Sequence, residues 1–281
     1  MKEIFINETS VYSGFGLFSR KGLLAWKDFV IELDGMKSTQ AVMDDISQRL
    51  CANNVIVFFD HHYAFDAVPL GFALAKYVES IQGALIPYAA HLDMGVGREG
   101  EFSVHYKFRT LAFHWLVQNI TKNNPEIKFL PTVRSFEMDT PRIRKIVDRD
   151  FQGANTKYLR TLIRMFSTNN AGQVCFLTPF SGIAFPGKPV LHPQLYRSID
   201  LVQAASKTDI PFYIAGAYPS WRAYRQYYAP LMSKHKIAIR GPFSLPVGDY
   251  KTAQTAVKNE LNSLREKAAF TPPDYDRILT K

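Results

Sequence analysis

Residues Val55 to His62 read VIVFFDHH, and this stretch is the clearest sign of the fold in the sequence. Its first five residues are β-branched or aromatic with no polar interruption, which is typical of a strand buried on both faces of a sheet. The apolar run stops at Asp60, and two histidines follow it. We therefore expect a central strand over 55–59 that presents polar side chains at its carboxyl end.

Apolar runs and helical patterns alternate along the rest of the chain. This alternation predicts an α/β fold, a single large domain with a mixed, mostly parallel sheet flanked by helices. We place that domain at 52–281 and an N-terminal helical segment at 1–51. Further strands are expected over 84–89, 127–133, 174–178, 211–215 and 236–240, and helices over 38–50, 70–80, 140–148, 154–166, 194–206 and 252–268.

The carboxyl ends of the strands are the places to look for chemistry, because the loops of such sheets open into a crevice there. In this sequence the expected strand ends are Asp60, Arg134, Pro179 and Gly216. We expect these four positions to border one crevice.

Composition and charge limit the classes of protein to which the chain can belong. With 281 residues, 47% of them hydrophobic, it can bury a core, and two cysteines, Cys51 and Cys175, cannot form a disulfide framework. We expect both thiols to be reduced and buried, which favours the cytoplasm. No run approaches the ~20 apolar residues of a membrane-spanning helix, so the sequence predicts a soluble or peripheral protein.

The positive charge lies in the second part of the chain. Residues 1–100 carry 8 Lys and Arg against 12 Asp and Glu, whereas residues 101–281 carry 26 against 13. A basic surface suits phosphate-bearing small molecules, anionic lipids, an acidic carrier protein or nucleic acid, and charge alone does not choose among them.

A histidine and an aspartate follow the central strand at a spacing that suits proton transfer. His61 precedes Asp66 by five positions. A neutral imidazole can accept a proton from a substrate hydroxyl, while a carboxylate on its other nitrogen orients the ring. The alternative is that Asp66 caps the next helix and that His61 and His62 bind loop carbonyls.

The His61–Asp66 spacing resembles the His-x4-Asp signature of the glycerolipid acyltransferases, the lysophosphatidate and soluble glycerol-3-phosphate acyltransferases. Asp60 stands where many members of that family have asparagine. Arg134 resembles the arginine of the family's second block, the strand over 211–215 its proline-led fourth block, and Gly241-Pro242 a turn that usually follows.

The third block of the family is only partly similar. Pro179, Ser181 and Gly182 resemble the proline-serine-glycine turn of the glycerol-3-phosphate branch, but the usual glutamate and arginine are absent. Lys188, Arg197 or Arg222 could replace that arginine as a phosphate ligand.

The resemblance implies transfer of a fatty acyl group from acyl-CoA or acyl carrier protein to an acceptor hydroxyl. The acceptor would be a glycerolipid precursor such as glycerol 3-phosphate or lysophosphatidate. His61 would act as the general base and Asp66 as its partner, without an acyl-enzyme, metal or cofactor. Arg134, Ser181, Gly182 and Lys188 would bind substrate; the alternative for Arg134 is an ion pair with Glu137 or Asp139.

An amphipathic pattern over 104–120 has two readings. It can insert into an anionic membrane surface, which predicts a protein peripheral to the membrane, or it can be a core helix. With Phe65 and Leu70, it is also a candidate wall for an acyl groove. The helix combines apolar and basic side chains: Phe108, Leu111, Trp115 and Leu116 with Lys107 and Arg109.

Other functions remain open from the sequence. The Asp60-His61-His62 triplet also resembles the metal motif of the DHH phosphoesterases, although no glycine-rich, histidine-bearing loop follows near the C-terminus. A noncatalytic protein that binds lipid or a carrier on the same fold is a further alternative. Nucleic acid is not expected as a partner, because an aromatic rim facing lipid explains the Tyr- and Trp-rich stretch over 218–228 equally well.

Overall fold

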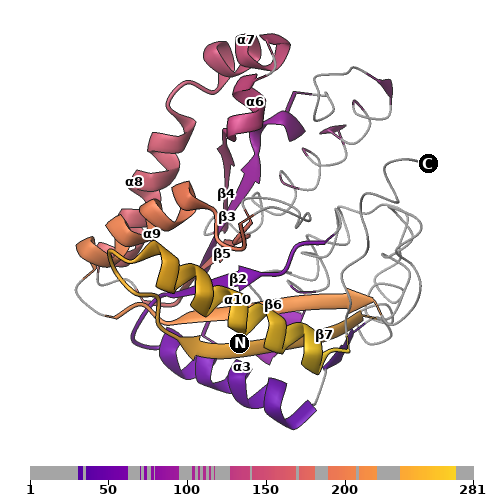
Figure 1. Cartoon of the computed structure of the whole chain (residues 1–281), viewed down its shortest axis with the longest axis vertical. Helices are drawn as coiled ribbons and strands as arrows, with labels where there is room; N and C mark the ends of the chain where they lie inside the picture. The colour runs from indigo at the N-terminus through magenta and orange to yellow at the C-terminus, as the bar shows by residue number, and fades with distance from the viewer. Residues whose placement is uncertain are drawn as a thin grey trace.

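The strands in the described part of the chain form one seven-stranded sheet with helices on both faces (Figure 1). The computed structural model describes residues 31–33, 36–62, 70, 73–74, 77–78, 80–94, 127–139, 141–168, 171–180, 189–206, 209–219 and 235–269, together with positions 103, 104, 107, 110, 111, 114 and 117. The predicted α/β fold, a single domain built on a mixed sheet, is confirmed.

The sheet is parallel except at one pair of strands. Its strands are β1 (Ile31–Leu33), β2 (Val55–Phe59), β3 (Gly83–Ala89), β4 (Ile127–Thr132), β5 (Gln173–Leu177), β6 (Phe212–Pro219) and β7 (His235–Phe243). Their spatial order is β1-β7-β6-β2-β5-β3-β4, and β6 and β7 form the antiparallel pair. The strand over 55–59 therefore lies in the middle of the sheet, as its apolar sequence predicts.

Helices cover both faces of the sheet, so the strands bury side chains on both sides. Helices α8 (Ala154–Ser167), α9 (Pro193–Ala205) and α10 (Tyr250–Lys267) pack on one face, here called the α8–α10 face. Helix α3 (Met36–Leu50) packs on the other, the α3 face, together with Leu70, Ala73, Leu74 and Val78 (Figure 1). Along β2, Ile56 and Phe58 point to the α8–α10 face and Val57 to the α3 face.

Local sequence signals explain where the helices begin. His192 caps α9 by accepting a hydrogen bond from the backbone N–H of Gln194, with Pro193 in the first turn. Asp249 caps α10 by accepting from the backbone N–H of Thr252 at 3.1 Å. Three further elements lie between β3 and α8: η1 (Ala90–Leu92), α6 (Ser135–Asp139) and α7 (Pro141–Asp150).

Two expected strand ends are wrong. β6 continues to Pro219, so Gly216 lies inside the strand, and β7 continues to Phe243, so Gly241-Pro242 is not in a turn. The reason is the antiparallel ladder between β6 and β7, which pairs Phe212 with Phe243 and Pro219 with His235. Hydrogen bonding between β6 and β7 keeps each strand extended beyond the end of its own apolar run.

The N-terminal part of the described chain belongs to the same sheet. β1 pairs with β7 in parallel, and Met43, Ile46 and Leu50 of α3 are buried against the α3 face. Residues 1–30 lie outside the described residues, and the boundary at residue 52 stays a prediction.

Candidate functional site

The carboxyl ends of β2, β3, β4, β5 and β6 meet at one edge of the sheet, because these strands are parallel to one another. Asp60 follows β2, Arg134 follows β4 and Pro179 follows β5. The structure thus brings three of the four expected strand ends to a common edge.

Asp60 is the centre of a buried polar network at this edge. Its carboxylate is fully buried and accepts two hydrogen bonds from Arg265 of α10, from Nε at 2.8 Å and from Nη2 at 2.7 Å. The Tyr218 hydroxyl of β6 donates a third at 2.8 Å, and His62 Nε2 lies 2.8 Å from Oδ1. One carboxylate therefore ties the end of β2 to β6 and α10.

The network keeps Asp60 ionised in a place where burial alone would neutralise it. Burial raises the pKa of the carboxyl, but the charge of His62 and the hydrogen bonds from Arg265 lower it by more. The net result is a pKa well below the ordinary range of an aspartate. The negative charge of Asp60 is thus balanced by the guanidinium of Arg265, which is distant in sequence.

Gly216 and Phe180 complete the surroundings of the network. A Cβ at Gly216 would overlap the Tyr218 ring, so only glycine lets this ring lie across β6 and reach Asp60. The Arg265 guanidinium also lies over the Phe180 ring, 5.8 Å from its centroid.

The two adjacent histidines have different surroundings. His62 is buried, with its ring beside Tyr218 and its Nε2 against Asp60. His61 is only partly buried, and its ring lies beside Phe59, with centroids 5.0 Å apart. Of the two, His61 is the one with access to solvent at the sheet edge. Its expected partner Asp66 lies outside the described residues.

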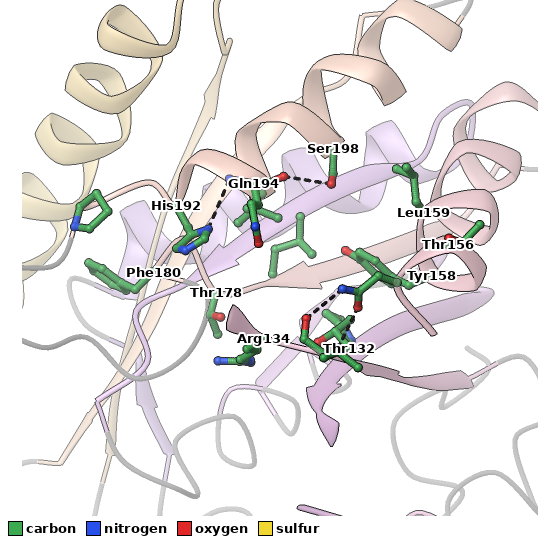
Figure 2. A pocket seen from close by; sticks show the side chains of 16 residues that line it. Thr132, Arg134, Thr156, Tyr158, Leu159, Thr178, Phe180, His192, Gln194 and Ser198 are labelled. Atoms are coloured by element: carbon green, nitrogen blue, oxygen red, sulfur yellow. Dashed lines mark hydrogen bonds between the residues drawn. The ribbon is translucent and has the colours of Figure 1, made fainter. Parts of the chain in front are cut away.

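A pocket of about 440 Å³ opens at the same edge on the α8–α10 face. Its walls come from the ends of β3, β4 and β5 and from the first turns of α8 and α9 (Figure 2). Arg134 lines it together with Thr178, Phe180 and His192. His61 is not among the lining residues; the Phe59 ring beside it packs toward the α3 face.

Contacts within the protein link the pocket to the two histidines. Phe180 lines the pocket, and the Arg265 guanidinium lies over its ring. Arg265 in turn binds Asp60, the residue directly before His61. On the other side of the pocket, the Asn155 side chain bonds both the N–H and the C=O of Val133, which fixes the start of α8 against the end of β4.

Glu137 fixes the backbone from which Arg134 projects. Its carboxylate is fully buried and accepts from the N–H of Arg134 at 2.6 Å and from the N–H of His91 at 2.6 Å. His91 Nδ1 lies 2.9 Å from the same carboxylate. Glu137 thus bonds the backbone of Arg134 and joins the ends of β3 and β4, while the Arg134 side chain lines the pocket.

Replacing Glu137 with glutamine should lower the free energy of unfolding by about 1–3 kcal/mol, because an amide cannot accept from all three donors and leaves a buried donor unsatisfied. Urea unfolding followed by circular dichroism measures this change. The matched control is Asp139→Asn in the same helix, where the side chain is exposed and little change is expected. Equal effects of the two substitutions would contradict the assigned role of Glu137.

The described helical residues at 104, 107, 110, 111, 114 and 117 contact the chain that follows β3 and include two exposed apolar side chains. Thr110 donates to the carbonyl of Leu92, and His114 Nε2 lies 2.6 Å from Asp93. Val104 is 84% exposed and Leu111 69% exposed, so at these two positions the helix is not core. Phe108, Arg109, Trp115 and Leu116 lie outside the described residues.

Other predicted residues lie outside the described residues or differ from expectation. Ser181, Gly182, Lys188, Arg222 and Phe65 lie outside the described residues. Arg197 is exposed on α9 and does not line the pocket, and Leu70 is buried in the core of the α3 face. Cys175 is buried as expected, but the expectation for Cys51 is wrong, because it is exposed at the end of α3.

Some residues of the site carry no local sequence signal. Arg265, Tyr218, His91 and His192 reach the sheet edge from elements far from residues 60–62. One signal was available: a buried aspartate at the end of a central strand requires a cationic partner. It does not say which of the 34 Lys and Arg residues supplies it.

Neither a metal cluster nor a membrane-spanning helix occurs in the described part of the chain. Within the described part of the chain, no three His, Cys, Asp or Glu side chains are grouped so that they could hold a metal ion. In the same part, none of the helices has the length and apolar character needed to cross a membrane.

Comparison with known proteins leaves the assignment to the site itself. No known protein family matches the chain, and no curated protein matches it either. The residues at the carboxyl edge of the sheet are therefore the guide to function.

Proposed function

We propose that this protein is an O-acyltransferase that uses His61 as a general base. The observation that carries the proposal is the position of His61, partly exposed directly after the central strand, at the sheet edge where Arg134 enters a pocket. The resemblance of the 61–66 spacing to the glycerolipid acyltransferases agrees with this geometry. The donor would be acyl-CoA or acyl carrier protein.

The reaction needs one base and no covalent enzyme intermediate. His61 accepts the proton of the acceptor hydroxyl while the hydroxyl oxygen forms a bond to the thioester carbonyl carbon. The carbon–sulfur bond then breaks, and the imidazolium returns the proton to the departing thiolate. Asp66 would orient the imidazole. The hydrogen bonds of Asp60 hold the backbone directly before His61.

Arg134 would bind the phosphate of the acceptor. Its side chain lines the pocket, and a guanidinium suits a phosphate through paired hydrogen bonds. The basic second part of the chain, with 26 Lys and Arg against 13 Asp and Glu in residues 101–281, would attract such a ligand.

We also propose that the protein associates peripherally with an anionic membrane surface. The exposed side chains of Val104, Lys107 and Leu111, which lie on one helix, support this proposal.

Replacing Arg134 with alanine should raise the KM for a phosphorylated acceptor by at least about tenfold, which corresponds to the loss of one charge-assisted contact. The KM for the thioester should stay unchanged. Steady-state kinetics with each substrate varied in turn measures both constants. The control is Arg197→Ala, which removes an exposed arginine of α9 outside the pocket. A rise in the thioester KM instead would assign Arg134 to the phosphates of the donor.

The proposal as a whole is tested by incubating the purified protein with acyl-CoA and with acyl carrier protein thioesters and a panel of hydroxyl acceptors. Acyl transfer that persists in EDTA and is lost in His61→Ala would support it. Hydrolysis of phosphate esters that EDTA abolishes would favour the metal phosphoesterase. Tight binding of thioester or lipid without turnover, unchanged in His61→Ala, would favour a noncatalytic binding protein.

A further inference from the structure

We infer that the outer sides of α7 and α8 form the surface with which this protein binds an anionic membrane. The inference rests on the membrane association proposed above and not on acyl transfer. It is carried by two matching rows of cations on consecutive helices, here called the basic stripes. They consist of Arg142, Lys145 and Arg149 in α7 and of Lys157, Arg160 and Arg164 in α8.

Each basic stripe lies on the side of its helix that faces away from the core. In α8 the buried side chains are Tyr158, Leu162 and Phe166, and all three cations of the stripe are exposed. At 3.6 residues per turn, the stripe lies opposite these buried side chains. In α7 the same offset relates the exposed stripe to the buried Ile143 and Val147. Packing on the core therefore turns both stripes toward solvent.

The charge of these two helices is unbalanced. Residues 141–167 contain seven Lys and Arg against two Asp and no Glu, a net charge of +5 out of +9 for the whole chain. α8 contains no acidic residue. Arg149 pairs with Asp150 at 2.7 Å, but this pair is exposed and contributes little, so an anionic surface can replace it.

Exposed apolar side chains lie on a helix attached to the same stretch of chain as α7. α7 packs against Met94, which follows η1 (Figure 1, where α7 is at the top). Thr110 donates to the carbonyl of Leu92, so its helix is held two positions earlier in the same stretch. Val104 and Leu111 of that helix are 84% and 69% exposed.

A lipid surface would use both features. Anionic head groups attract the basic stripes, and exposed apolar side chains can insert between them. Nucleic acid would use the cations alone, because its phosphates gain nothing from aliphatic side chains. A protein partner needs an apolar anchor at the centre of its interface. Among the described residues, none of the exposed large apolar side chains lies on α7 or α8.

Vesicle sedimentation with the full chain tests the inference. Vesicles of phosphatidylcholine mixed with phosphatidylglycerol should bind the protein, and vesicles of phosphatidylcholine alone should bind it much more weakly. Each cation near an anionic surface tightens binding about fivefold. The triple variant Lys157→Gln, Arg160→Gln, Arg164→Gln should therefore bind the anionic vesicles about 100-fold more weakly than wild type.

A matched control removes three exposed cations from other helices. The triple variant Arg197→Gln, Lys251→Gln, Lys258→Gln lowers the net charge by the same amount, on α9 and α10. Its binding to anionic vesicles should fall far less than that of the α8 variant. Both variants should keep the melting temperature of wild type, because all six side chains are exposed.

Several outcomes would overturn the inference. Equal losses in the two triple variants would mean that net charge, rather than the stripe on α8, drives binding. Equal binding to neutral and anionic vesicles, or binding to neither, would also overturn it. Tighter binding of a single-stranded RNA oligonucleotide than of anionic vesicles, lost in the α8 variant, would assign the stripes to nucleic acid instead.

Acyl transfer between soluble substrates separates this inference from the proposed enzyme activity. The α8 variant should retain that activity, because its three altered side chains do not line the pocket. Acyl transfer by a wild-type protein that binds no vesicles would contradict the inference alone. Binding to anionic vesicles that depends on the α8 stripe, without acyl transfer, would support the inference and contradict the proposed activity.

Discussion

Replacing His61 with alanine should lower the turnover number of acyl transfer by about 10²-fold or more, the usual loss when a general base is removed. The KM values should change little, since the proposed base acts on the proton rather than on binding. The melting temperature should also change little, because His61 is only partly buried beside Phe59. Steady-state kinetics and thermal unfolding of the same preparation measure these quantities.

His62→Ala is the matched control for this prediction. His62 is buried with Nε2 2.8 Å from Asp60, so its loss should lower stability and leave the turnover number of the folded fraction nearly intact. If the two substitutions reduce turnover equally, or if His61→Ala has no effect, the assignment of the base to His61 is wrong.

Replacing Asp60 with asparagine should lower the free energy of unfolding by about 3–5 kcal/mol at neutral pH, as expected when one partner of a buried ion pair is removed. The Arg265 guanidinium, whose side chain is 18% exposed, would lose its counter-charge and at least one of its two hydrogen bonds, because an amide has only one acceptor oxygen. Urea unfolding measures the change. The control is Asp150→Asn, which breaks the exposed pair with Arg149 and should leave stability nearly unchanged.

The stability that Asp60 provides should depend on pH in one direction. Because the pKa of this carboxyl is lower in the folded protein than in the unfolded chain, the stabilisation is fully present above the unfolded pKa of about 3.9. It is lost as the pH falls from there toward the folded pKa. The difference between wild type and Asp60→Asn should therefore shrink below about pH 4. A difference that stays constant from neutral pH to pH 3 would contradict the ionised state of Asp60.

A double-mutant cycle isolates the contact itself. Asp60→Asn and Arg265→Gln should each be strongly destabilising, while the double variant should lose much less than the sum of the two. Additive losses would mean that the two side chains stabilise the protein independently of each other.

The class of fold and the position of the central strand could be predicted from the sequence. Five consecutive apolar residues at 55–59 leave no polar side for solvent, so the strand must be covered on both faces. Helical patterns between the strands supply that cover, and capping residues such as Asp249 set the start of a helix locally. The place of His61 after this strand follows from the same local pattern.

The side chains that bind Asp60 could not be predicted from local patterns. Asp60 and Arg265 are 205 residues apart, and Asp60 and Tyr218 are 158 residues apart. Nothing local distinguishes Arg265 from the other basic residues of the helices. Only the packing of α10 on the sheet brings its guanidinium to the end of β2.

Burial and periodicity are properties of short segments, so the residue pattern alone predicts an α/β protein with polar side chains at the end of a buried central strand. The strand order, the extension of β6 past Gly216 and the pocket that Arg134 shares with α8 and α9 are set by tertiary contacts. These depend on pairing and packing between distant segments, whose free energy is shared among many contacts and leaves no signature in any one stretch of residues.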